Sequence, residues 1–340
     1  MADTFGNGAA EYCAATEGIA VLDRSYMGRF KVTGKDATDL LNRLSSNKVD
    51  VLPSGTGAAT VLPTNKGRVI DLLHLFALED HILMVTSPQT RQRVPEWIDL
   101  YTFLEEVSIE DATLETAMIT VLGPRSATAL EHAAGPSVAS LELYHSLSLT
   151  INGVTVVMAR TDPTGSPGYD LIMPLENAAT VWSALIDPAY DAVPIGETTY
   201  NVLRTEAGIP RYGWEINEDV NPWEVGLDRF INFEKGCYTG QEVILRLYNY
   251  SKIQRRIVGL SFPSPNVSEG AVLRFDGKDV GRVTSVITHP VTGAALGLGI
   301  VRVANAKEGA RLEAVNAQKE TVGEAILHEL QVMTPVGLSG

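Results

Sequence analysis

The chain has 340 residues, enough for two or three domains, and 45% of them are hydrophobic, enough to build buried cores without disulfide bonds. Its net charge of −14 excludes a general nucleic-acid binder, because an acidic surface repels phosphate backbones. The two cysteines, Cys13 and Cys237, lie far apart and form no Cys-x-x-Cys pair, so neither a disulfide framework nor a zinc site is predicted.

The start of the chain and its apolar runs indicate where the protein is found. The first positive charge is Arg24, and the residues before it show neither the basic and apolar regions of a secretory signal nor the Arg-rich pattern of a transit peptide. No apolar run reaches the roughly 18 residues of a membrane span. We therefore expect a soluble, cytoplasmic protein in a reducing compartment, with neither a membrane nor a nucleic acid as partner.

The first 252 residues predict mixed α and β structure. Apolar residues in 37–44 repeat with the period of an amphipathic helix. Branched apolar runs at 69–78 and 82–86 flank a short polar segment and predict a β-hairpin. Further helices are expected at 88–104, 124–134 and 178–185, and further strands at 118–122, 154–159 and 169–173.

The pattern changes near residue 252 to short strands at close spacing. Asp276-Gly277 between two of them is a strong signal for a hairpin turn. We therefore predict the α+β class, with a body at 1–252 and a small antiparallel β-barrel or sandwich at 253–340. The expected strands of this second domain are 257–262, 271–275, 280–288, 295–303 and 311–314.

The octet Lys235-Gly236-Cys237-Tyr238-Thr239-Gly240-Gln241-Glu242 is predicted to be a loop that runs into a helix. Thr239 and Glu242 have the spacing of a capping box ahead of the apolar residues that follow. Glu242 and Arg246 are four residues apart, which favours an ion pair on the helix. Cys237 is therefore expected just before a helix N-terminus.

Two interpretations of Cys237 follow from this position. The partial positive charge of the helix start and nearby Lys235 both favour thiolate over thiol, so this sulfur is a candidate reactive group, with room left by Gly236 and Gly240. The alternative is a small buried hydrophobe, the usual role of a free cysteine. The six histidines show no paired ligand spacing, so no bound metal is expected.

The window 235–256 is locally basic in an acidic chain. It carries five cationic side chains against Glu242 alone. Such a window attracts a small anionic ligand, or it is a solvated face beside a domain boundary. Its cations are Lys235, Arg246, Lys252, Arg255 and Arg256.

The complete octet resembles the signature of YgfZ-type proteins, a branch of the superfamily that includes the glycine-cleavage T-protein, a tetrahydrofolate-dependent aminomethyltransferase. Residues 203–208 are similar to the Arg-Leu-Glu-Ala-Gly segment of T-proteins, and a Tyr-Gly pair, here Tyr212-Gly213, follows in both. Residues 221–227 resemble their Pro-x-Glu-x-Gly-Leu stretch. The resemblance extends from about residue 20 to the end and implies interleaved α/β subdomains around a folate site, closed by the β domain.

The resemblance also implies which residues contact tetrahydrofolate. Arg204 and Glu206 are the principal ligands that it suggests, and the chemistry agrees, since an arginine can hold a carboxylate tail and an acid can pair with the N–H groups of a pterin edge. The alternative is that the two residues form an internal ion pair supporting a turn. The predicted folate-binding set is completed by Tyr212, Tyr238, Gly240, Gln241 and Arg246, and the predicted catalytic set is Cys237, Lys235 and Asp71.

Three positions depart from the T-protein pattern. Residues 65–72 resemble a stretch ending Gly-Val-Ile-Asp-Asp-Leu, but Leu72 replaces its second Asp. Residues 160–166 resemble Arg-Thr-Gly-Tyr-Thr-Gly-Glu, with Pro163 in place of Tyr and Ser166 in place of the folate-contacting Glu. These changes remove carboxylates that orient folate and manage protons, which weighs against glycine cleavage itself. Asp71 remains as a partner, or as an edge or turn contact of its strand.

Three functions are compatible with these features. The first is a tetrahydrofolate-binding YgfZ-type protein that supports assembly or repair of iron-sulfur proteins, through those proteins or their assembly factors, with Cys237 as the reactive residue. The second is a transferase that moves an aminomethyl or methyl group to tetrahydrofolate. The third is a folate-binding module without chemistry, acting as a sensor or scaffold.

Overall fold

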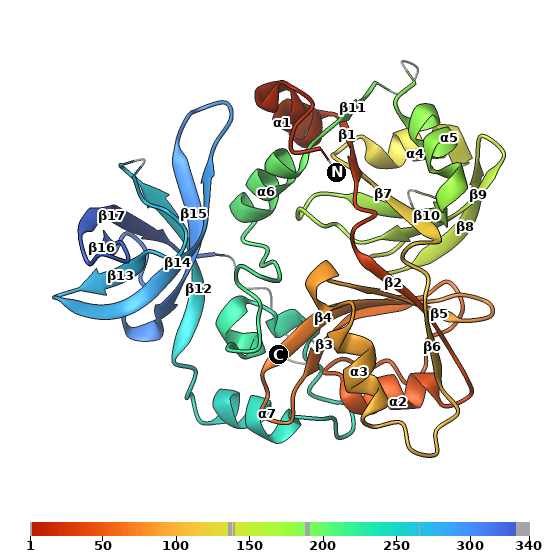
Figure 1. The fold of residues 1–340 in the computed structure, drawn as a ribbon, viewed down its shortest axis with the longest axis horizontal. Coiled ribbons are helices and arrows are strands. Elements are labelled where there is room, and N and C mark those ends of the chain that lie inside the picture. Colours follow the sequence, from red (N-terminus) through yellow and green to blue (C-terminus); the bar gives the residue numbers. More distant parts are fainter. Residues whose placement is uncertain (1, 135–137, 139, 188–190, 265, 331–340) are drawn as a thin grey trace. The chain divides into compact units, whose positions relative to one another are not determined.

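The computed structural model describes residues 2–134, 138, 140–187, 191–264 and 266–330 (Figure 1). The chain forms two compact units: unit 1 comprises Met1–Leu62 and Asp71–Tyr200, and unit 2 comprises Pro63–Ile70 and Asn201–Gly340. The domain boundary expected near residue 252 falls inside unit 2 and stays a prediction. Residues 331–340 of the predicted second domain lie outside the described ranges.

Unit 1 contains a six-stranded sheet in the order β11-β1-β7-β10-β9-β8. β7 runs antiparallel to both β1 and β10, and β11 is parallel to β1. Strands expected at 118–122, 154–159 and 169–173 are confirmed as β7, β9 and β10. The strands are β1 (Ile19–Asp23), β7 (Thr116–Leu122), β8 (Ser146–Ile151), β9 (Val154–Arg160), β10 (Gly168–Pro174) and β11 (Ala192–Pro194).

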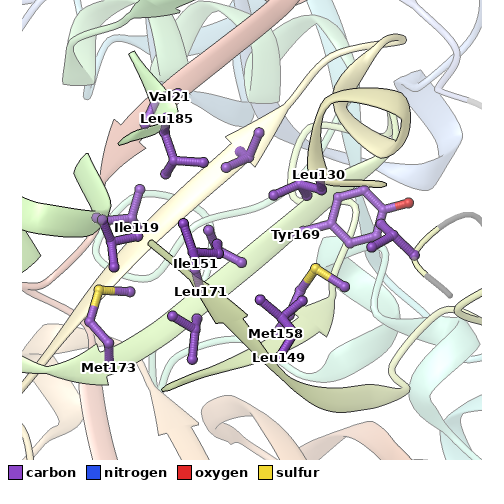
Figure 2. Close-up of a cluster of buried hydrophobic side chains, with 14 of the residues drawn as sticks. Val21, Ile119, Leu130, Leu149, Ile151, Met158, Tyr169, Leu171, Met173 and Leu185 are labelled. Carbon is purple, nitrogen blue, oxygen red and sulfur yellow. The ribbon is translucent and has the colours of Figure 1, made fainter. Parts of the chain in front are cut away.

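One face of this sheet carries a large apolar core. Alternate residues of a strand point to the same face, so Val21, Ile119 and Leu171 pack together from three neighbouring strands (Figure 2). Two helices, α4 (Ser126–Ala134) and α5 (Ala178–Leu185), contact the sheet and contribute Leu130 and Leu185 to the core. Both helices were expected from the sequence, and both are confirmed.

A second sheet of unit 1 has the order β3-β4-β5-β2-β6. The predicted hairpin is confirmed, because β4 and β5 are adjacent and antiparallel. The helix expected at 37–44 is also confirmed as α2 (Ala37–Leu44), which buries all four of its periodic apolar residues. The strands are β2 (Gly28–Thr33), β3 (Gly57–Pro63), β4 (Val69–Ala77), β5 (Ile82–Thr86) and β6 (Ser108–Asp111).

The single helix expected at 88–104 is wrong in its extent. The segment forms a 3₁₀ turn, η1 (Pro88–Thr90), followed by the short helix α3 (Arg93–Asp99). Pro95 explains the break, because a proline lacks the N–H for a helical hydrogen bond and its ring clashes with the carbonyl four residues earlier. It is tolerated only in the first turn of a helix, which is where α3 places it.

Several elements of the N-terminal two thirds were not expected from the sequence, including the strands β1, β2, β3, β6, β8 and β11. The helical elements among them include α1 (Gly8–Glu17), η2 (Leu175–Asn177) and α6 (Glu197–Glu206). Asn7 caps α1 by accepting a hydrogen bond from Ala10 N. Buried Glu11 of α1 accepts hydrogen bonds from Gly196 N and Thr199 Oγ1, so a long-range polar contact holds α1, whose sequence has little amphipathic pattern.

Unit 2 ends in a closed antiparallel barrel of six strands, in the order β12-β15-β14-β13-β16-β17 (Figure 1). The predicted α+β body followed by a β-barrel is therefore confirmed. Asp276 and Gly277 both adopt positive φ, at 48° and 73°, as their hairpin turn requires. The strands are β12 (Arg255–Phe262), β13 (Val272–Phe275), β14 (Lys278–Thr288), β15 (Ala295–Arg302), β16 (Arg311–Val315) and the unexpected β17 (Thr321–His328).

Unit 2 also contains the second part of α6, several short turns and one further helix. Besides α6, these elements are η3 (Pro222–Val225), η4 (Asp228–Phe230), α7 (Gln241–Asn249) and η5 (Val303–Asn305). None of the helices in the described ranges combines the length and the apolar character that crossing a membrane requires.

Candidate functional site

The octet 235–242 forms a loop that leads into α7, with side chains alternating between the interior and solvent. Gly236 and Cys237 are exposed, whereas Lys235 and Tyr238 on either side of them are buried. The alternative interpretation of Cys237 as a small buried hydrophobe is therefore wrong. The thiol lies at the surface of unit 2 between two anchored neighbours.

Tyr238 fixes the loop from inside. Its ring joins an apolar cluster with Trp223, Ile231 and Ile244. Its hydroxyl is buried without a hydrogen-bond partner among the described residues, and burial raises the pKa of this phenol well above its usual value. Lys235 Nζ lies 5.1 Å from the centre of the Tyr238 ring, a cation–π contact between the two buried side chains of the loop.

The helix after the loop begins differently from the predicted capping box. Its N-cap is Gly240, and no side chain caps it. Thr239 lies outside the helix, and Glu242 is at its second position instead of the third that a capping box requires. Position 240 requires glycine for a steric reason. A Cβ atom there would lie 2.4 Å from Thr64 O, and only glycine adopts the local φ of 77° without strain.

A turn between β3 and β4 packs against this helix start within unit 2. The turn is closed by hydrogen bonds from Gly67 N to Thr64 O at 2.9 Å and from Thr64 N to Arg68 O at 2.7 Å. A Cβ atom on Gly67 would lie 3.1 Å from Ile244 Cγ1, so a second glycine permits the close approach. The segment around Gly67, which resembles a T-protein stretch, and the octet, which resembles the YgfZ-type signature, are thus neighbours in the fold.

Arg204 is buried and bonded at all three guanidinium nitrogens. Nη1 donates to Glu215 Oε2 at 2.8 Å, Nη2 to Ser285 Oγ at 2.7 Å, and Nε to Asn201 Oδ1 at 2.7 Å. The structure thus contains the internal ion pair that was the alternative interpretation of Arg204, but its partner is Glu215. A role for Arg204 in binding a folate carboxylate stays a prediction.

Glu215 was missed by the sequence reasoning. It is fully buried, and besides Arg204 it accepts hydrogen bonds from Thr284 Oγ1, Ser285 Oγ and Arg211 N. Its nearness in sequence to the Tyr212-Gly213 pair was the available signal. Its partners on β14 are some 70 residues away in sequence, and no local pattern reveals them.

The contacts of the other predicted folate ligands described below do not include Arg204. Glu206 faces His289, with 3.3 Å between Oε1 and Nε2, and Tyr212 forms an isolated bridge with Ile216. Gln241 is the first residue of α7, and its N–H donates to Tyr238 O. Arg246 is exposed on the same helix, and the expected ion pair with Glu242 is not formed within the described part of the chain.

Two cations of the basic window 235–256 are already paired. Arg255 donates to both oxygens of buried Glu224, at 2.8 and 3.2 Å, and Arg68 Nη1 lies 3.7 Å from the same carboxylate. Arg256 donates to Glu329 at 2.8 Å. The positive charge that this window offers to a ligand is therefore smaller than its composition suggests.

Asp71 belongs to unit 1 and is completely buried. Its carboxylate accepts hydrogen bonds from Ser87 N and Ser87 Oγ, both at 2.8 Å, from Thr90 Oγ1 and from Leu72 N. Burial raises the pKa of this carboxyl to about 6, although these hydrogen bonds oppose the shift. The geometry gives Asp71 a structural role in closing the η1 turn, and a catalytic role stays a prediction.

The described residues contain no group of three or more His, Cys, Asp or Glu side chains suited to a metal ion. In and beside the octet lie an exposed thiol, a buried lysine and an exposed guanidinium, those of Cys237, Lys235 and Arg246.

Comparisons with known proteins assign this architecture to a family. Residues 2–235 match the GCVT N-terminal domain, and residues 255–328 match the glycine cleavage T-protein C-terminal barrel domain. The chain therefore belongs to the glycine cleavage T-protein family. The narrower resemblance of the octet to the YgfZ branch stays a prediction.

Individual relatives agree with this family. A chloroplastic protein of Arabidopsis thaliana named as a transferase is 29% identical over 303 residues, which cover 89% of this chain and 69% of the relative. An aminomethyltransferase of Thermotoga neapolitana is 29% identical over 309 residues, covering 90% and 84%. The crystal structure of the glycine cleavage system aminomethyltransferase T from Bartonella henselae shares the fold, with a TM-score of 0.84 at 21% identity over 96% of this chain and 89% of that one.

Proposed function

We propose that this chain binds tetrahydrofolate or a one-carbon derivative of it. The observation that carries the proposal is the match to both T-protein domains, in order, along residues 2–235 and 255–328. Tetrahydrofolate is the cofactor that the T-protein resemblance implies. When bound, it supplies ring nitrogens that accept or carry the one-carbon group.

The predicted ligands fit this cofactor unequally. Arg204 is a poor candidate for the carboxylate tail, since Glu215, Ser285 and Asn201 already occupy its guanidinium group. Arg246 is exposed and has no ion pair in the described ranges, so it is the better candidate. The carboxylate of Glu206 would accept hydrogen bonds from the N–H groups of the pterin edge.

Transfer of a one-carbon group to tetrahydrofolate is the activity that the relatives support. Several of them, including that of Thermotoga neapolitana, are named aminomethyltransferase, and this chain matches most of their length. Glycine cleavage itself is a weaker candidate, because Leu72 and Ser166 replace carboxylates of the T-protein pattern and the carboxylate of Asp71 is enclosed by hydrogen bonds. A different aminomethyl or methyl donor is therefore proposed.

A second candidate is YgfZ-type support of iron-sulfur proteins. The observation that favours it is the complete octet, in which the thiol of Cys237 is exposed between two buried anchors. An exposed thiol before a helix start can react with a partner protein or an assembly factor, which a buried one cannot.

Calorimetric titration with tetrahydrofolate tests the common element. Binding that weakens on Arg246→Ala supports the proposed ligand, and no binding would contradict the proposal as a whole. Conversion of tetrahydrofolate to a one-carbon adduct with a panel of amine, sulfonium and methoxy donors tests the transferase.

Iron-sulfur enzyme activities in cells test the second candidate. Cys237→Ala should lower them while leaving folate binding intact, and Cys13→Ala, at an exposed cysteine of α1, is the matched control. Normal activities in the Cys237 variant would exclude a reactive role in this process. The third function, a folate-binding module without chemistry, is supported by a combination of three results. Folate would bind, no donor would form an adduct, and the iron-sulfur enzymes would have normal activity.

A further inference from the structure

Unit 1 contains a cavity of about 470 Å³ that the family assignment does not explain. It lies at the end of β1 and the start of β7, and η2, α5 and the N-terminal segment at Ala2 and Phe5 complete its lining. We propose that this cavity binds a small organic ammonium ion with an aromatic or branched apolar body.

The walls of the cavity suit an apolar body. Leu22, Ile119 and Ile195 come from the sheet side, and Leu175 and Trp182 come from η2 and α5. The rings of Phe5 and Trp182 are stacked, with their centres 6.3 Å apart. The volume is within the range of small-molecule sites, which are mostly apolar and have few polar groups.

The polar part of the cavity carries a negative charge. Among the described residues that line it, Asp23 is the only charged one. Asp23 Oδ1 accepts a hydrogen bond from Ser25 N at 2.9 Å, and its second oxygen has no hydrogen bond from any residue in the described ranges. The Ser25 hydroxyl is already used, because it accepts from Met118 N and donates to Met118 O.

A single carboxylate with spare acceptor capacity in an apolar cavity selects a cation that donates hydrogen bonds. The aromatic pair adds a surface that attracts both a flat ring and a positive charge. None of the residues that the T-protein resemblance suggests as folate contacts lines the cavity, and a folate carries carboxylates that Asp23 would repel. The cavity therefore favours a cationic ligand over an anionic one such as folate.

Calorimetric titration with three probes of one shape tests the charge selection. Phenethylamine should bind, 2-phenylethanol should bind about tenfold more weakly or worse, and 3-phenylpropanoate should not bind. Equal binding of the amine and the alcohol, or no binding of the amine at millimolar concentration, would overturn the proposal. Saturating tetrahydrofolate should leave amine binding unchanged, and competition would mean that the two share one site.

Two variants place the ligand in this cavity. Asp23→Asn keeps an acceptor for Ser25 N but removes the charge, and it should weaken phenethylamine binding about tenfold. Ala179→Leu on α5 fills the cavity and should abolish binding, whereas Thr180→Leu, exposed on the same helix and outside the lining, should leave it unchanged. Thermal unfolding of each variant shows that it is folded. Unchanged binding in folded Asp23→Asn or Ala179→Leu would contradict the assignment.

Discussion

The Cys237 loop and Arg204 were both marked by resemblance to one superfamily, but their environments are opposite. Cys237 is exposed, and its buried neighbours hold the loop that presents it. Arg204 is buried, and every nitrogen of its guanidinium group is bonded within unit 2. The difference shows that residues marked by one sequence pattern can be exposed at the surface or bonded inside the fold, and that only the exposed ones are accessible to a ligand without rearrangement.

Breaking the buried pair should have the largest effect. Glu215→Ala leaves the Arg204 charge buried without its partner, which should lower the free energy of unfolding by about 3–5 kcal/mol. Urea unfolding followed by circular dichroism measures this change. Exposed Glu234→Ala is the control, with an expected change within about 0.5 kcal/mol. A small loss for Glu215→Ala would mean that Glu215 does not hold Arg204, and Arg204 would again be a candidate ligand for the folate carboxylate.

The two glycines of the octet should differ strongly from each other. Gly240→Ala places a Cβ against Thr64 O in a backbone region with positive φ, which should cost about 2–4 kcal/mol of stability. A Cβ on Gly236 meets no atom within 4 Å, so Gly236→Ala should be tolerated. Thermal unfolding of both variants gives the comparison. Equal losses would mean that the loop is not held by the turn at Thr64.

The buried carboxyl of Asp71 should appear in the pH dependence of stability. Its pKa is raised from 3.8 to about 6 in the folded state. The stabilisation that this shift adds to the free energy of unfolding is therefore complete below about pH 3.8 and is lost as pH rises through about 6. This group lowers the unfolding free energy by at most about 1.4 kcal/mol per pH unit in that window.

The difference between the wild type and Asp71→Asn isolates this effect, because other carboxyls titrate in the same range. The decline between pH 4 and about 6 should be shallower in Asp71→Asn than in the wild type. Exposed Asp99→Asn should follow the wild type. Parallel curves for the wild type and Asp71→Asn would show that folding does not raise the pKa of Asp71.

The exposed thiol should have the smallest effect on stability. Cys237→Ala removes no buried contact, so the unfolding free energy should change by less than about 0.5 kcal/mol. A thiol reagent should label Cys237 in the folded protein as well as in urea. Protection of Cys237 in the folded protein would contradict its surface position.

Local patterns predicted much of the fold. The helix α2, the hairpin of β4 and β5, and the Asp276-Gly277 turn follow from residues close in sequence. The helix α1 and strand β17 were missed, since the first is held by contacts to Gly196 and Thr199, and Gly323-Glu324 interrupts the apolar pattern of the second.

The candidate site was predictable only in part, for the same reason. The octet could be recognised as a loop before a helix because the signal is contiguous in sequence. Its wrong capping box and the missed Glu215 both depend on atoms far away in the chain, Thr64 O in one case and Ser285 Oγ in the other. Exposure of Cys237 is likewise a property of the folded surface.

The short segment Pro63–Ile70 limits how this protein can be divided. Its flanking residues belong to unit 1, yet Thr64 and Gly67 supply the backbone against which α7 starts in unit 2. A fragment that begins at Asn201 would therefore carry the whole octet but lack the turn that shapes it. Complementation by a peptide covering 63–70 would be needed to restore the Cys237 loop, so the two units cannot be obtained intact by a single cut.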